Sequence, residues 1–159
     1  MTSKQSFPNP QHIIERESIA FVQSCWHKDI VDELRQSFSQ HFQTLSNKEI
    51  DFFEVPGAFE IPLQTKYLAQ TEKYAGIVAA GLVVDGGIYQ HEFVATAVID
   101  GLMQNQLESG TSIFSAVLTS HDFISDGQAE FFKEHFVIKG IEAADACAQT
   151  LEAMAKITA

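Results

Sequence analysis

The sequence predicts an α/β three-layer sandwich, in which a central parallel sheet of about four strands is flanked by helices on both faces. Two observations lead to this prediction. Strand-like apolar runs alternate with helix-like segments along the chain, and such alternation is typical of parallel sheets built with right-handed crossovers. The run AGIVAAGLVV at 75–84 is apolar throughout, as expected of a strand covered on both faces.

The first half of the chain contains two predicted strands and two predicted helices. A strand is expected at 18–25 and another at 50–55. Between them, apolar residues recur at helical spacing: Ile30, Val31, Leu34, Phe38, Phe42 and Leu45. After Pro56-Gly57, a short helical face is formed by Leu63, Tyr67 and Leu68, and Pro62 fits only in the first turn of that helix.

The second half continues the alternation after the strand at 75–84. A long helix is expected from 91 to 109, ended by Gly110, and a last strand at 111–119. The tail from about 127 to 157 is expected to form one or two helices with a break at Gly140. This order of elements is that of a flavodoxin-like sandwich. The 159 residues suit one compact domain, expected at 17–159, and residues 1–16 predict an N-terminal arm that is flexible or docked on a neighbouring subunit.

The composition excludes several classes of protein. A formal net charge of -11 without a basic stripe argues against nucleic-acid binding and against an anionic membrane surface. Cys25 and Cys147 lack the spacing of a disulfide framework or a zinc site, so reduced core thiols are expected. The first sixteen residues lack the pattern of a signal peptide, and no segment is apolar enough to span a bilayer. The expected location is the cytoplasm.

Familiar catalytic motifs fail on inspection. The segment HEFVA at 91–95 begins like a zinc-protease helix, but Ala95 stands where the second histidine is needed. The chain has no Walker loop, no dinucleotide fingerprint and no G-x-S-x-G elbow. The loop after the first strand also lacks the hydroxyl- and glycine-rich character of a flavodoxin-type carrier. No metal and no cofactor are therefore expected.

A candidate site lies at the predicted strand ends, because ligands of open α/β sheets bind beyond the carboxyl ends of the strands. The candidate loops are 25–29, 56–60, 82–91 and 119–127. Trp26 offers a flat face for a heteroaromatic ring, backbone N–H groups at 58–60 face the position of a ligand, and His91 offers an imidazole for acid/base chemistry. Gly86-Gly87 lets the backbone approach a phosphate or carbonyl closely. Each feature has an ordinary alternative, since Trp26 can be a core or interface residue, Gly86-Gly87 a simple turn and His91 a structural or solvated residue.

Four segments, in this order along the chain, indicate the function more specifically than these patterns do. FEVPGAFEIPL, GLVVDGGIYQHEFVATAVIDGL, FSAVLTS and HFVIKGIEAADA resemble successive landmarks of the lumazine synthases, the penultimate enzymes of riboflavin biosynthesis. The resemblance runs from about residue 18 to the C-terminus. The extra residue in GGIYQHEF and the tryptophan in CWH resemble the subgroup of these enzymes that forms decamers.

The resemblance implies a reaction and an assembly. The family joins 5-amino-6-(D-ribitylamino)uracil to 3,4-dihydroxy-2-butanone 4-phosphate, giving 6,7-dimethyl-8-ribityllumazine, phosphate and water, with no metal and no redox cofactor. A homo-oligomer is implied, either a pentamer or a dimer of pentamers, with active sites shared between subunits. The alternative hypothesis is a lumazine- or flavin-binding oligomer with little or no turnover.

The resemblance also implies a role for each matching residue. His91 matches the proton donor. The matches for substrate binding are Trp26 under the pyrimidine ring, Ala58, Phe59 and Glu60 along the ribityl chain, Leu82, Val83 and Val84 at the uracil edge, and Ser115 and Lys139 on the pocket wall. Gly87 and Ile88, in the turn that begins at Gly86, match the loop beside the butanone phosphate.

One position departs from the family pattern. Many members hold the phosphate with an arginine on the helix before the Lys-Gly pair, but the segment GQAEFFKEHFVIKG contains none, and Glu130 stands near that place. Lys133 or His135 must then substitute, and His135 is the residue we assign to phosphate binding. Loss of a charge-assisted bidentate contact costs on the order of 1.5 to 3 kcal/mol.

Overall fold

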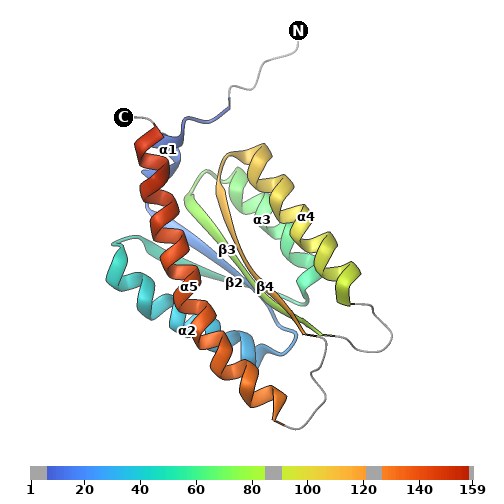
Figure 1. The fold of residues 1–159 in the computed structure, drawn as a ribbon. Coiled ribbons are helices and arrows are strands. Elements are labelled where there is room, and N and C mark those ends of the chain that lie inside the picture. The colour runs from blue at the N-terminus through green and yellow to red at the C-terminus, as the bar shows by residue number, and fades with distance from the viewer. Residues whose placement is uncertain (1–6, 85–90, 121–126, 158–159) are drawn as a thin grey trace.

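The structure is a computed structural model of the chain, and it describes residues 7–84, 91–120 and 127–157. It confirms the predicted sandwich (Figure 1). Four parallel strands form one sheet in the order β2-β1-β3-β4: β1 (Ser18–Ser24), β2 (Glu49–Val55), β3 (Tyr74–Val84) and β4 (Ser112–Ser120). The helical elements are α1 (Pro10–Ile14), α2 (Lys28–Leu45), the 3₁₀ turn η1 (Ala58–Glu60), α3 (Ile61–Gln70), α4 (His91–Ser109) and α5 (Gln128–Ile157).

Helices cover both faces of the sheet, with α2 and α5 on one side and α3 and α4 on the other (Figure 1). The central strand β1 is buried along its whole length, and β3 is buried except at its last residue. Alternate side chains of β1 enter two different cores, because successive residues of a strand point to opposite faces. Ile19 and Phe21 pack toward α2 and α5, whereas Ala20 and Val22 pack toward α3.

The predicted apolar face of α2 is confirmed. Ile30, Val31, Leu34, Phe38 and Phe42 are all buried, and Phe38 contacts Phe21 of β1 with 5.2 Å between ring centroids. Leu45, at the end of the helix, stays largely exposed.

The predicted break at Gly140 is wrong, because α5 continues through it as one helix of 30 residues. Gly140 instead lies where α5 packs very closely against α2. A Cβ atom at this position would overlap the Ser37 Oγ and the Leu34 carbonyl oxygen, and would lie 2.9 Å from the Phe38 nitrogen. The residue was misinterpreted because a glycine needed for helix packing looks in sequence like a glycine that ends a helix.

The predicted face of α3 is only partly correct. Pro62 lies in the first turn as expected, and Leu68 is buried. Leu63 and Tyr67, however, are 62% and 63% exposed on the outer side of this chain. The inner face is formed by Ile61, Thr65 and Leu68, which recur at helical spacing toward the sheet.

The helix α4 begins at His91 and ends at Ser109 as predicted. Gly110 then adopts a φ of 74°, a left-handed conformation that suits glycine after a helix.

The described part of the N-terminal arm contacts its own chain. Helix α1 was not expected, because five residues are too few to show a period. Its Ile13 is buried, and Lys48 donates hydrogen bonds from Nζ to the carbonyl oxygens of Ile14 and Arg16, at 2.8 Å and 2.5 Å. Residues 1–6 of the arm lie outside the described residues.

Candidate functional site

Three of the predicted site segments meet at the carboxyl edge of the sheet. Trp26 follows the end of β1, η1 follows the end of β2 and His91 opens α4 after β3. The elements carrying these residues are in contact, since η1 packs against β1, β3 and α4. The chain therefore brings an aromatic ring, a carboxylate and an imidazole to one edge from three different crossovers.

Trp26 is held by the turn between β1 and α2. The preceding N–H group, that of Cys25, donates to the carbonyl oxygens of Val55 and Pro56 at 2.9 Å and 3.1 Å, which fastens the end of β1 to the end of β2. The Trp26 ring lies against Gly57, where a Cβ atom would overlap Cε2 and Cζ2 of the indole. Trp26 is 45% exposed, so the core alternative is wrong and the ring is accessible to a flat ligand.

The turn η1 places the carboxylate of Glu60. The Gly57 N–H donates to Glu60 Oε2 at 2.9 Å, and the Glu60 N–H donates back to the Gly57 carbonyl at 3.2 Å. The Glu60 N–H therefore closes the turn and does not face a ligand, which corrects the expectation for this group. Ala58 is buried, whereas Phe59 is 64% exposed.

His91 lines a cleft of about 380 Å³ between α4 and the end of β4. Its side chain is 5% exposed, and Thr119 of β4 lies on the opposite wall. Acidic groups, Glu92 and Asp100, also line the cleft. The cleft is large enough to hold a small ligand beside the imidazole.

The end of β3 lies between the end of β1, which leads to Trp26, and the end of β4, which lines the His91 cleft. Leu82 and Val83 are buried and Val84 is partly exposed, and the strand pairs with β4 up to Val84 and Ser120. The predicted residues Gly87 and Ile88 lie outside the described residues, as do most of the loops 82–91 and 119–127.

Three predicted site residues lie away from this edge in the same chain. Ser115 pairs with Ala79 in the middle of β4, five residues or roughly 16 Å before the end of the strand. His135 and Lys139 lie on α5, in the layer on the other face of the sheet (Figure 1). Lys139 is eleven residues, or roughly 16 Å, along the axis from the start of α5. Within one chain, Ser115 and Lys139 therefore lie far from this edge, and His135 lies in a different layer from His91.

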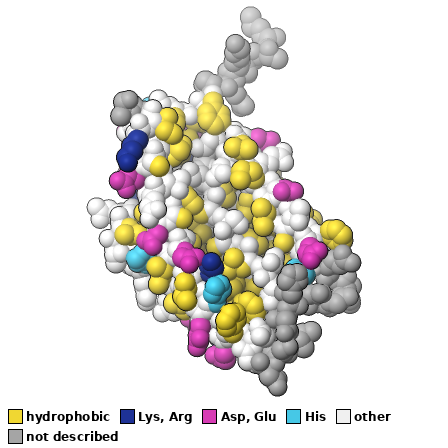
Figure 2. All heavy atoms as spheres, in the orientation of Figure 1, with side chains coloured by type: hydrophobic (Ala, Val, Ile, Leu, Met, Phe, Trp, Pro, Cys, Tyr) yellow, Lys and Arg dark blue, Asp and Glu magenta, His cyan; other side chains and the backbone are white. Residues whose placement is uncertain are grey.

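The basic residues of α5 already have contacts inside the chain. Lys139 donates to Glu142 at 2.8 Å, and His135 stacks on Phe131 with 5.9 Å between ring centroids. Lys133 pairs with Asp29 at 3.5 Å and with Glu130 at 3.8 Å. Acidic side chains also outnumber basic ones on the face shown in Figure 2. An anion bound here must compete with carboxylates for Lys133 and Lys139.

Comparison with known proteins decides the family. The family model described as 6,7-dimethyl-8-ribityllumazine synthase matches residues 16–155. The chain belongs to this family. It is 56% identical to 6,7-dimethyl-8-ribityllumazine synthase 2 of Pseudomonas syringae pv. tomato, with 85% of this chain and 81% of the relative covered. It is 53% identical to the synthase 2 of Bradyrhizobium diazoefficiens (85% and 82% covered) and 52% identical to the synthase of Rhodococcus erythropolis (89% and 93% covered).

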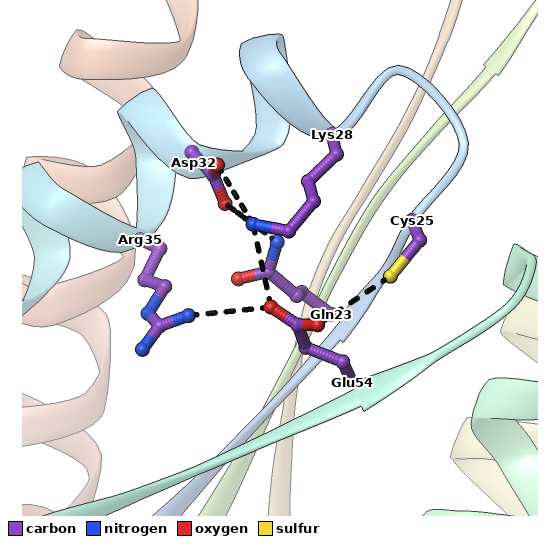
Figure 3. A network of polar contacts seen from close by, with 6 residues as sticks. All are labelled: Gln23, Cys25, Lys28, Asp32, Arg35 and Glu54. Carbon is purple, nitrogen blue, oxygen red and sulfur yellow. Dashed lines mark hydrogen bonds and ion pairs between the residues drawn. The ribbon is translucent and has the colours of Figure 1, made fainter.

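A polar network beside Trp26 was missed in the sequence (Figure 3). It joins α2 to β2, with Lys28, Asp32 and Arg35 on α2 and Glu54 near the end of β2. Gln23, on β1, and Cys25, directly after β1, also belong to the network. Burial raises the pKa of the Cys25 thiol, and the nearby Glu54 carboxylate raises it further. Cys25 is partly exposed, so the expectation of a core thiol holds for Cys147 but is wrong for Cys25. The sequence did not predict this network, because charged residues on a helix and on an edge strand normally face solvent.

The described ranges 7–84, 91–120 and 127–157 contain no group of three or more His, Cys, Asp or Glu side chains arranged to hold a metal ion. In the same part of the chain, no helix is long and apolar enough to cross a membrane.

Proposed function

We propose that this member of the lumazine synthase family catalyses the condensation of 5-amino-6-(D-ribitylamino)uracil with 3,4-dihydroxy-2-butanone 4-phosphate. The products are 6,7-dimethyl-8-ribityllumazine, phosphate and water, and the reaction belongs to riboflavin biosynthesis. The observation that carries the proposal is the placement of Trp26, Glu60 and His91 at one edge of the sheet in a chain that matches the family model over residues 16–155.

The uracil substrate binds between Trp26 and the end of β3. The exposed face of the indole stacks on the pyrimidine ring, and the backbone of Leu82, Val83 and Val84 hydrogen-bonds its edge. The ribityl chain extends over Ala58, Phe59 and Glu60, where the carboxylate accepts hydrogen bonds from its hydroxyl groups. The fixed position of Glu60, held by the Gly57 N–H, supports this role.

His91 transfers protons in the cleft beside this binding site. The primary amine of the uracil attacks the ketone and one water leaves to give an imine, phosphate leaves by elimination, and the second amine closes the ring with loss of a second water. Each step moves a proton, so one acid/base group together with substrate positioning is sufficient. The position of His91 in a cleft of about 380 Å³ supports its assignment as the acid/base group.

The phosphate binds beside Gly87 and Ile88 and is contacted by His135. Lys133 is the weaker candidate, because it is already paired with Asp29 and Glu130. His135 reaches the phosphate from a neighbouring subunit, since its helix lies in the opposite layer of its own chain. Ser115, in the middle of β4, and Lys139, on the same helix as His135, complete the pocket wall from a neighbour.

A homo-oligomer, either a pentamer or a dimer of pentamers, supplies that neighbour. The outer faces of α3 and α4 expose large apolar side chains that a single chain leaves in water: Leu63, Tyr67, Phe93, Ile99, Met103 and Leu107. Burial of this surface against a second copy would stabilise the assembly. Sedimentation measures the assembly directly, and a fully active monomer would refute a shared site.

The competing function is a lumazine- or flavin-binding oligomer with little turnover, favoured by the missing phosphate arginine. The two functions are separated by mixing both substrates with the protein and following the absorbance and fluorescence of the lumazine. An enzyme forms the lumazine faster than the protein-free mixture. A binder quenches Trp26 fluorescence when lumazine is added but forms product only at the spontaneous rate.

A further inference from the structure

The network in Figure 3 contacts both ends of the turn 25–28, to which Trp26 belongs. Glu54, near the end of β2, is its centre. Its Oε2 accepts a hydrogen bond from the Cys25 thiol at 3.8 Å, and its Oε1 pairs with Lys28 at 3.3 Å. Cys25 immediately precedes Trp26, and Lys28 follows it by two residues. One carboxylate therefore contacts the chain on both sides of the indole.

Glu54 is itself fixed from α2. Arg35 pairs with Glu54 Oε1 at 3.6 Å, and the guanidinium of Arg35 lies over the Phe52 ring at 4.2 Å from its centroid. This contact limits the positions open to Arg35 and thus to the carboxylate that it pairs with.

The other side of the turn is fixed through Asp32. Both carboxylate oxygens of Asp32 accept from Lys28 Nζ at 2.9 Å, and Oδ1 also accepts from the buried Gln23 Nε2 at 2.9 Å. Lys28 is thus bonded to a carboxylate on its own helix and to a carboxylate on β2. Loss of Glu54 would leave Lys28 with Asp32 alone, so the Lys28 side of the turn would lose its tie to β2, while the Cys25 N–H would keep its hydrogen bonds to Val55 and Pro56.

The turn needs such support because its backbone is strained. His27 has φ 52° and ψ 47°, the left-handed region that non-glycine residues rarely adopt. Strained conformations persist where the surrounding structure over-determines them. The contacts on the two sides of His27 are those of Cys25 with the end of β2 and those of Lys28 with Glu54 and Asp32.

We infer that Glu54 is a positioning residue for uracil binding: by contacting Cys25 and Lys28 it holds the turn 25–28, and with it the indole of Trp26, in the orientation that stacks on the pyrimidine. This inference rests on the proposed function, in which Trp26 binds the uracil substrate. Glu54 acts through Trp26 and touches no reacting atom.

The test uses the variant Glu54→Gln in the full-length protein, with Glu49→Gln as the matched control at the other end of the same strand. Exposed ion pairs contribute modestly, so KM for the uracil substrate should rise about threefold to fivefold in Glu54→Gln, while kcat stays within about twofold of the wild type. Glu49→Gln should leave both constants unchanged. A loss of folding alone would lower the active fraction, and with it kcat, without this split.

Trp26 is the sole tryptophan of the chain, so its fluorescence reports the turn without any turnover. Acrylamide should quench Trp26 more efficiently in Glu54→Gln than in the wild type or Glu49→Gln. High salt should increase quenching in the wild type and change it less in Glu54→Gln, because salt screens partly exposed ion pairs.

Equal quenching and equal KM in Glu54→Gln and the wild type would overturn the inference. If the wild type forms no lumazine above the spontaneous rate, the proposed function fails, and the accessibility of Trp26 still decides whether Glu54 holds the turn.

Discussion

The indole of Trp26 lies directly over Gly57, in the space that a side chain at residue 57 would occupy. A Cβ atom there would lie 2.9 Å from Trp26 Cη2 and closer to Cε2 and Cζ2. This relationship joins the end of β1 to the end of β2 and makes the glycine of the VPGAFEIP segment a determinant of ring position.

Gly57→Ala should therefore displace the indole and weaken binding of the uracil substrate. We expect KM for that substrate to rise about tenfold, equivalent to about 1.4 kcal/mol, as overpacking typically costs 1 to 3 kcal/mol. The emission of Trp26 should shift at the same time. Unchanged emission together with unchanged KM would contradict the contact.

Gly140→Ala should destabilise the fold rather than the site. The added methyl group would overlap Ser37 and the backbone of Leu34, and rigid backbone cannot move away cheaply. We expect a loss of about 3 kcal/mol in the free energy of unfolding. Gly101→Ala is the control, because its Cβ would meet only Pro62, at 3.0 Å and 3.2 Å, and alanine favours the helix. Equal stability of the two variants in urea titrations would show that the close approach of α2 and α5 is unimportant.

His135→Asn should weaken binding of the butanone phosphate while leaving KM for the uracil substrate unchanged. Hydrogen bonds to charged groups contribute about 1.5 to 3 kcal/mol, so we expect KM for the phosphate substrate to rise at least about tenfold. Lys133→Met should have a smaller effect, since Lys133 is already paired with Asp29 and Glu130. Steady-state kinetics with each substrate varied in turn measures both. The reverse order of effects would assign the phosphate to Lys133.

Asp51 should contribute to the pH dependence of stability. A hydrogen bond from Lys73 Nζ and a second from the Tyr74 hydroxyl hold the pKa of Asp51 below its ordinary value of 3.8. A carboxylate with a depressed folded-state pKa contributes stability that is complete above the unfolded pKa and is lost as the pH falls through the folded pKa. Asp51→Asn should therefore be less stable than the wild type at pH 7, with a difference that shrinks below about pH 4. Thermal unfolding across this range measures the effect, and two parallel stability curves would exclude it.

Much of the fold followed from local patterns, whereas part of the site did not. The apolar run 75–84 and the helical spacing of α2 are local signals, and both elements formed as predicted. Gly140 was misread because its role depends on Ser37, about a hundred residues away in sequence. The contacts of Glu54 with Cys25, Lys28 and Arg35 likewise join separate elements, so no local sequence pattern predicted them. Trp26, Glu60 and His91 each follow a strand, and for that reason the sequence already grouped them. Ser115 and Lys139 lie in the middle of their elements, so their proposed place in the site requires a second chain.

The central claim is that two copies of this chain together build a site that forms 6,7-dimethyl-8-ribityllumazine. The most direct test co-assembles His91→Ala with Lys139→Met, after each variant is measured alone. His91→Ala by itself should slow turnover without stopping it, because positioning contributes independently of proton transfer.

In a randomly mixed oligomer at equal amounts, about one quarter of the sites between neighbours combine an intact His91 with an intact Lys139. The rate of lumazine formation per subunit should then rise toward about a quarter of the wild-type rate, well above the mean of the two variants. A site built within one chain has no intact copy in such a mixture. A rate equal to that mean would contradict the shared site, and a wild type no faster than the protein-free mixture would contradict the enzyme itself.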